Sequence, residues 1–410
     1  MRKALPLILA ALITLPGLWL KLSGATLPPP PAALLSGLAI LGASFLLLWA
    51  CDVAQLDIPQ TLALAVVALI AVLPEYAVDM YFTWQAGKHP ELNYAHYAIA
   101  NMTGANRLLI GVAWSSLAAI HWFKVRRRII LDVEQRTEVL FLGLATAYAF
   151  FVPIKGSLAW YDGIVFLAIY VWYIRLASQR PCQECELEGP AELIGALPKA
   201  RRRALTVGLF LFAAGVILAN AELFSENLVA SGKVFGINEF LLVQWLAPIA
   251  SEAPEFIVAI MFVLRGQAST AMGSLLSSKL NQWTLLVGMI PGVYGLASGT
   301  FAHPLPLGTY QLHEIFLTAA QSLLAVALLA SLSLSPGAAA LLFSMFAGQL
   351  LSPYVAHGLN LPPLPWGNGT DGLHQLFSAG YVVMFLIVAW MKRQDVWALR
   401  HGASVEQRII

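Results

Sequence analysis

Two Pro-Glu pairs lie inside long apolar segments of this chain, at Pro74-Glu75 and at Pro254-Glu255. An ionised carboxylate costs at least about 2.5 kcal/mol at the centre of a bilayer, so it persists mainly where it faces a cavity, a partner or a cation. The proline beside it frees the backbone carbonyl one turn earlier, at Ile70 and at Ala250. Because carboxylates and free carbonyls both bind cations, the two pairs predict a cation or proton site.

Each pair has a second carboxylate on the same expected helix face. Asp79 follows Glu75 by four residues, and Glu252 precedes Glu255 by three. We expect the four carboxylates to meet at one level and to bind a hard divalent cation or several monovalent ones, since Ca²⁺ and Na⁺ both favour oxygen ligands. The alternative is a set of salt bridges to Arg107 and Lys279, which also lie in apolar segments.

The apolar segment that follows each pair supplies neutral oxygen ligands. These are Asn101, Thr103 and Asn106 after the first pair, and Ser274, Ser277, Ser278, Asn281 and Gln282 after the second. Such side chains can replace a hydration shell, or they can bond across packed helices. Lys279 does not fit a cation site, because a buried ammonium repels cations. One interpretation is that its ammonium is a tethered cation, which takes the place of one transported ion. The alternative is a structural salt bridge.

The elements that must position these residues are transmembrane helices. Hydrophobic residues make up 59% of the 410 residues, charged residues only 11%, and the mean hydropathy is +0.73. We expect about twelve spans, at 4–22, 31–51, 59–86, 93–123, 137–154, 158–177, 204–223, 236–264, 270–298, 310–332, 335–355 and 374–391. The fold class is therefore an all-α polytopic membrane protein, with the first segment kept as a helix and not removed as a signal peptide.

The basic residues predict the orientation of the chain. With both termini in the cytoplasm, only Lys21, Lys88, Lys155 and Lys233 lie outside, and the large basic blocks fall on the cytoplasmic side. This bias accounts for the net charge of +2 and gives no reason to invoke nucleic acid. We expect a multi-pass protein of the cell (inner) membrane, whose partners are inorganic cations and the lipid bilayer. The oligomeric state stays open.

The order of features repeats along the chain. In each half, an apolar run with Pro-Glu is followed by a polar break, a polar and small stretch and a Leu-Leu-x-Gly element, at 59–123 and at 236–298. The expected organisation is an N-terminal half at 1–177, a cytoplasmic linker at 178–203 and a C-terminal half at 204–410. The two repeats run in opposite directions through the bilayer, an arrangement that puts substrate sites near the midplane.

Other chemistry has little support in the sequence. Cys182 and Cys185 form one C-x-x-C pair in the linker, which is a weak zinc or redox signal without a second pair. The chain has no phosphate-binding glycine loop, so ATP-driven pumping is not supported and no cofactor is expected. An intramembrane hydrolase using Glu75 and His96 is the alternative of another class, but paired metal-ligand or nucleophile motifs are missing.

The two repeats resemble those of the cation/calcium exchanger superfamily, which includes the sodium/calcium exchangers. That family has a Gly-(Ser/Thr)-Ser-x-Pro-Glu type motif on one helix and a Gly-Asn-x-x-Gly-Ser-Asn type motif on the next. The resemblance implies that Glu75, Glu255 and Ser251 are cation ligands, together with Ser278 and Gln282 of the second motif. In the first repeat it selects either Asn101 or Asn106, depending on the alignment. Lys279 stands where the family usually has Asn.

The resemblance implies a secondary cation antiporter that works by alternating access. The leading hypothesis is Na⁺ or H⁺ driven Ca²⁺ exchange, and the alternative within the same fold is Na⁺/H⁺ or K⁺/H⁺ exchange. The candidate cation ligands are Glu75, Asp79, Asn101, Asn106, Ser251, Glu252, Glu255, Ser278 and Gln282.

Overall fold

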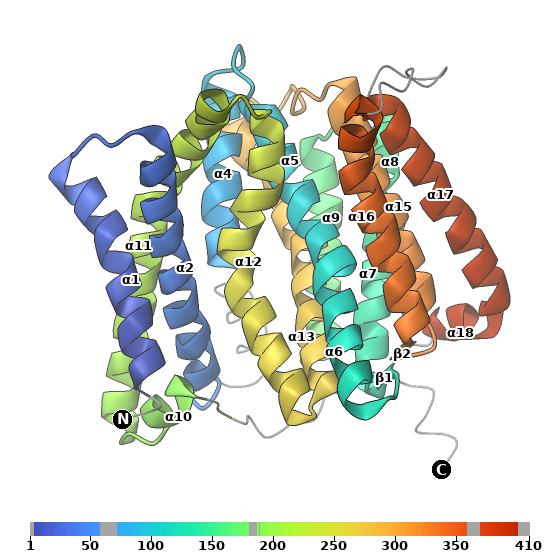
Figure 1. The fold of residues 1–410 in the computed structure, drawn as a ribbon, viewed down its shortest axis with the longest axis horizontal. Helices are drawn as coiled ribbons and strands as arrows, with labels where there is room; N and C mark the ends of the chain where they lie inside the picture. Colours follow the sequence, from blue (N-terminus) through green and yellow to red (C-terminus); the bar gives the residue numbers. More distant parts are fainter. Residues whose placement is uncertain (1–3, 58–71, 180–186, 188, 359–369, 401–410) are drawn as a thin grey trace. The chain divides into compact units, whose positions relative to one another are not determined.

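A computed structural model describes the chain except for residues 1–3, 58–71, 180–186, 188, 359–369 and 401–410. The described part consists of helices and one two-stranded sheet (Figure 1). It divides into two compact units, residues 1–101 with 174–255 and residues 102–173 with 256–410. Each unit combines segments from both predicted halves.

The first unit is built around helix α2. Helices α1 (Leu5–Ser23) and α11 (Lys199–Phe235) both pack against α2 (Pro29–Ala54). Small residues make this packing close: a Cβ on Gly17 would lie 2.5 Å from the Ala39 side chain. Without a hydrophobic driving force between helices in lipid, such close contact supplies much of the attraction.

Helix α11 is longer than the predicted span 204–223. It runs through polar residues at both ends, since helix propensity is not limited to the part that crosses the bilayer. Its end at Phe235 is set by Gly236, which has φ 64°, a left-handed conformation that glycine adopts at little cost. The short helix α10 (Pro190–Gly195) lies within the predicted linker and also contacts α2.

Three further elements complete the first unit. They are α4 (Leu73–Lys88), the first half of α5 (Tyr94–Leu108) and α12 (Glu239–Arg265) as far as Glu255. On the predicted cytoplasmic side, Asp57 accepts hydrogen bonds of 2.8 and 2.9 Å from the Arg202 guanidinium and one of 3.0 Å from Arg203. Arg202, with a smaller contribution from Arg203, lowers the pKa of Asp57 to about 2.

The second unit begins with the rest of α5 and ends with α18 (Arg393–Ala398). Its long helices include α15 (Thr309–Leu329), which packs against α17 (Thr370–Met391) and α7 (Arg136–Ala149). The remaining helices are α6 (Ser115–Val125), α8 (Phe151–Lys155), α9 (Trp160–Ala177, nearly all in this unit), α13 (Ala268–Asn281), α14 (Val287–Ser298) and α16 (Pro336–Gly358), with the 3₁₀ turn η2 (Val133–Gln135).

Two helices of the second unit contain π-helical segments. Segment η1 (Leu109–Trp114) joins α5 to α6, and η3 (Gln282–Leu286) joins α13 to α14. The small sheet pairs β1 (Ile129–Ile130) with β2 (Ser333–Leu334) in antiparallel register, Ile129 opposite Leu334. It ties the turn after α6 to the turn before α16.

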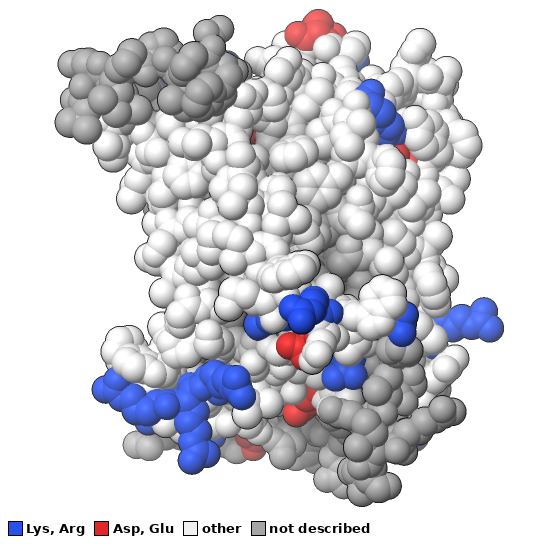
Figure 2. All heavy atoms as spheres, turned by 90° about the vertical axis from the view of Figure 1, so that its right-hand side faces the viewer, with Lys and Arg blue, Asp and Glu red and all other residues white. Residues whose placement is uncertain are grey.

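The described helices confirm a multi-pass helical membrane protein. Each predicted span that lies wholly in the described residues coincides with helix, while part of the span 59–86 lies outside them. By length and hydropathy, nine helices of the described chain are able to cross a membrane, so the predicted number of twelve is not established. Figure 2 shows one face on which most Lys and Arg atoms lie below a belt with almost no charged atoms.

Candidate functional site

The carboxyl group of Glu75 is buried at the start of helix α4. Pro74 occupies the beginning of the helix, where its missing N–H costs no hydrogen bond, and Glu75 stands in the first turn. The free N–H groups and the dipole of a helix N-terminus favour a negative charge at this position. Only 2% of Glu75 is exposed. The carbonyl of Ile70, predicted to be freed by Pro74, lies outside the described residues.

Helix α12 brings the second Pro-Glu pair to the same place. It is continuous through Pro248 and Pro254, and the Ser251 hydroxyl lies within hydrogen-bonding reach of the Glu75 carboxyl. The charge of Glu255 also acts on Glu75, so the two glutamates lie within electrostatic range of each other. The first unit therefore contains the Glu75–Glu255 pair that the repeat predicted.

Asp79 and Asn101 form the second part of this cluster. Asn101 Nδ2 donates a hydrogen bond of 2.8 Å to Asp79 Oδ1, and both side chains are buried. Within the described residues, Glu75 Oε2, Asp79 Oδ2 and Asn101 Oδ1 have no hydrogen-bond partner. Buried oxygens without a partner are rare and costly, so three of them in one cluster point to a bound cation or proton.

That four carboxylates meet at one level stays a prediction. In the described part of the chain, no three Asp, Glu, His or Cys side chains are close enough to hold a metal by themselves. Neutral groups contact two of the carboxylates: Asn101 bonds to Asp79, and Ser251 lies at Glu75. Glu252, 7% exposed, lies on α12 next to Ser251. A cation here would need oxygens from amides, hydroxyls or carbonyls as well as carboxylates.

The other predicted ligands belong to the second unit. Asn106 is fully buried; its Nδ2 donates to the carbonyl of Met102 at 2.8 Å, and its Oδ1 accepts a hydrogen bond of 2.6 Å from Lys279 Nζ. Ser278 and Gln282 are buried at the end of α13 and the start of η3. The candidate ligands therefore form two groups, one with the acidic residues and one with Lys279.

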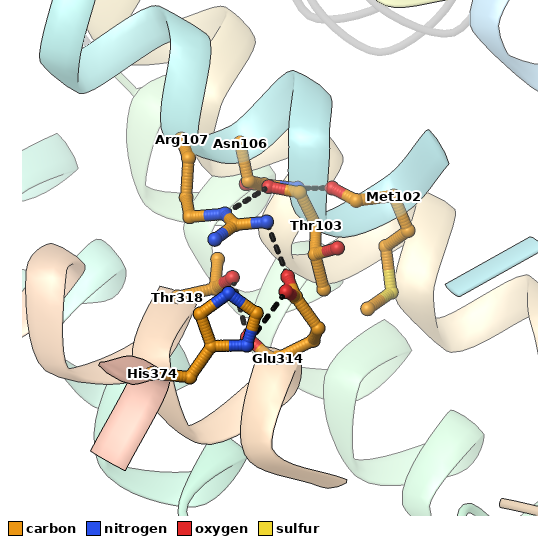
Figure 3. A network of polar contacts seen from close by, with 7 residues as sticks. All are labelled: Met102, Thr103, Asn106, Arg107, Glu314, Thr318 and His374. Carbon is orange, nitrogen blue, oxygen red and sulfur yellow. Dashed lines mark hydrogen bonds and ion pairs between the residues drawn. The ribbon is translucent and has the colours of Figure 1, made fainter. Parts of the chain in front are cut away.

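Arg107 forms a buried ion pair that the sequence analysis missed. Its guanidinium pairs with Glu314 of α15, and the Nδ1 atom of His374 on α17 lies 3.3 Å from the other carboxylate oxygen (Figure 3). The side chains of Arg107 and Glu314 are 2% and 0% exposed. The sequence did contain a signal: Glu314 is the single carboxylate inside the predicted span 310–332. Since an unpaired carboxylate in lipid costs free energy, it requires a partner.

The fold and the buried acidic cluster are typical of one class: a multi-pass membrane protein of the exchanger type, with Pro-Glu pairs on two helices. The model of the sodium/calcium exchanger protein family matches residues 31–179 and again 205–355. The chain belongs to this family of cation/calcium exchangers.

Solved structures agree with this assignment. The chain is 42% identical to the H⁺/Ca²⁺ exchanger CAX, with a TM-score of 0.90 and 98% of both chains covered. The sodium-calcium exchanger NCX_Mj shares the fold at 19% identity and a TM-score of 0.52, over 78% of this chain and 97% of that one. A protein of Alkalimonas amylolytica that carries the name antiporter CaxA is 24% identical over 250 residues, 58% of this chain and 73% of the other.

Proposed function

We propose that this protein exchanges Ca²⁺ for protons across the membrane, with Glu75 and Glu255 bound alternately by the two ions. The observation that carries the proposal is the cluster at Glu75. A buried carboxyl there faces the Ser251 hydroxyl and the charge of Glu255, and it retains an oxygen without a partner among the described residues. The likeness to the H⁺/Ca²⁺ exchanger CAX over nearly the whole chain supports protons as the coupling ion.

The chemistry of the cluster suits this exchange. Carboxylates bind Ca²⁺ when ionised and lose it when protonated, so one set of oxygens serves both ions in turn. Asp79 and Asn101 supply two further oxygens that are buried and without partners in the described part of the chain. A neutral carboxyl pair and a calcium-bound pair both avoid an uncompensated buried charge. With either load, the protein can therefore change the side of the membrane that its site faces, while the empty ionised state is strongly disfavoured.

The test is ion flux in liposomes that contain the purified protein. We expect ⁴⁵Ca²⁺ uptake driven by an outward H⁺ gradient, accompanied by H⁺ efflux recorded with a trapped pH dye. Glu75→Gln and Glu255→Gln should reduce both fluxes to the level of protein-free liposomes. Glu222→Gln is the matched control, since Glu222 is an exposed carboxylate of the same unit, paired with Lys21. Its flux should equal that of the unmodified chain.

Two results would contradict the proposal. Uptake driven by a Na⁺ gradient and indifferent to pH would replace protons with sodium as the coupling ion. No Ca²⁺ flux under either gradient, with Na⁺/H⁺ or K⁺/H⁺ exchange instead, would favour the alternative in which the positive charge of Lys279 excludes a divalent ion.

A further inference from the structure

We propose that the ammonium of Lys279 is a resident monovalent cation that permanently occupies the position at Asn106 Oδ1, so that no mobile cation binds there. The proposal removes Asn106 from the set of ligands for the transported ion. It rests on contacts within the second unit and not on the proposed exchange.

The first argument is the geometry of the contact. Lys279 Nζ lies 2.6 Å from Asn106 Oδ1 and 4.6 Å from the centre of the Trp283 ring, and both Lys279 and Asn106 are fully buried. An amide oxygen and the face of an indole are the groups that hold an ammonium or an alkali cation when water is removed.

The second argument is the register of the two repeats. Segment η1 begins at Leu109 and η3 begins at Gln282, which sets the repeats 173 residues apart by subtraction. This spacing aligns Gly104-Ala105-Asn106 with Ser277-Ser278-Lys279. The alternative, which aligns the two Leu-Leu-x-Gly elements, puts η1 and η3 out of step by four residues. Since π-helical turns are rare and concentrate at functional sites, their matching start favours the first alignment.

In this register Lys279 is the counterpart of Asn106, and the two counterparts contact each other. The second repeat thus replaces a neutral amide, which could bind a mobile cation, with a side chain that brings a cation of its own. Because the ammonium is covalently attached to the chain, its positive charge stays at this position. The fixed charge opposes binding of a mobile cation at the same position.

The experiment is chemical rescue of Lys279→Ala. In this variant the proposal predicts that free NH₄⁺ binds in the vacated position, so the melting temperature should rise with NH₄⁺ concentration and saturate. The unmodified chain and Lys392→Ala should show no saturable rise. Lys392 is the matched control because its Nζ also bonds within the second unit, to Leu328 O at 2.6 Å and Ser331 Oγ at 2.8 Å. Methylammonium and tetramethylammonium test the size of the position, with only the smaller ion expected to bind.

A second variant tests the acceptor. Asn106→Leu removes the acceptor oxygen and leaves residue 279 unchanged, so the double variant Lys279→Ala/Asn106→Leu should show no saturable NH₄⁺ binding. If Lys279→Ala does not fold in ordinary buffer, Lys279→Gln carries the same NH₄⁺ titration.

The outcomes separate the two proposals. Without Ca²⁺ flux in the unmodified chain, the proposed function fails while the NH₄⁺ titration still decides the role of Lys279. Equal NH₄⁺ dependence in Lys279→Ala and Lys392→Ala would overturn the resident cation and leave Lys279 as a structural residue.

Discussion

Replacing Glu314 by Leu tests how much the buried ion pair with Arg107 contributes to stability. Both side chains are at most 2% exposed, so water screens neither charge. Glu314→Leu leaves the Arg107 guanidinium buried without its carboxylate, and breaking a buried pair in this way costs about 3–5 kcal/mol. We expect a loss of that size in the free energy of unfolding. His374 beside the same carboxylate cannot replace it, because it supplies no negative charge.

The double variant Arg107→Leu/Glu314→Leu separates a broken pair from an absent one. With neither charge present, an apolar pair of similar volume costs little, so the double variant should recover most of the loss. The assay is unfolding by sodium dodecyl sulfate in mixed micelles, followed by tryptophan fluorescence. Glu222→Leu, which removes an exposed ion pair with Lys21, should change stability by no more than about 1 kcal/mol. A double variant as unstable as Glu314→Leu would refute the reasoning.

Three further predictions follow from contacts described above. Asp57→Asn should lower stability above about pH 4. Because Arg202 lowers the pKa of Asp57 to about 2 from an ordinary 3.8, the stability advantage of the unmodified chain should disappear as pH falls from 4 to 2. Paired thermal unfolding curves measure this, and an equal difference at pH 2 and pH 7 would contradict it. Gly111→Ala should lower the free energy of unfolding by about 1–3 kcal/mol, since a Cβ there would lie 2.3 Å from the Phe346 ring. Gly208→Ala, with open space around it, should not destabilise the protein in the same unfolding assay. Asp79→Asn should weaken Ca²⁺ binding at least 10-fold in equilibrium ⁴⁵Ca²⁺ titrations with Glu222→Gln as the control, and unchanged affinity would remove Asp79 from the site.

Sequence patterns were sufficient for the membrane class, for the family and for the pairing of the two Pro-Glu helices. Apolar length and the cost of a buried carboxylate are local properties, so they can be counted along the chain. The two anchor glycines of the Leu-Leu-x-Gly elements are also points of close approach: a Cβ on Gly111 would meet Phe346, and one on Gly288 would lie 3.1 Å from the Gly163 carbonyl. The repeat thus marked positions where helices touch.

The partners of the buried charged residues could not be predicted from the sequence. Salt bridges from Arg107 and Lys279 to the acidic cluster were the alternative to cation binding, yet Arg107 pairs with Glu314 and Lys279 donates to Asn106. Which of several buried groups a side chain reaches depends on helix rotation within a fraction of a turn, and hydropathy does not specify rotation. The first repeat's register was open for the same reason. The π-helical segments, whose spacing favours one alignment, have no sequence signature of their own.

The Lys279–Asn106 contact also bears on how such a chain could have arisen. In an inverted repeat, counterparts that touch each other lie on the pseudo-two-fold axis, so in a dimer of two identical half-chains each would face its own copy. Two lysines at that point would repel, and two asparagines would carry no charge. A lysine bonded to an asparagine requires two different residues at one symmetric position, so the two halves must differ in sequence there. Two copies of either half of this protein could therefore not reconstruct the contact.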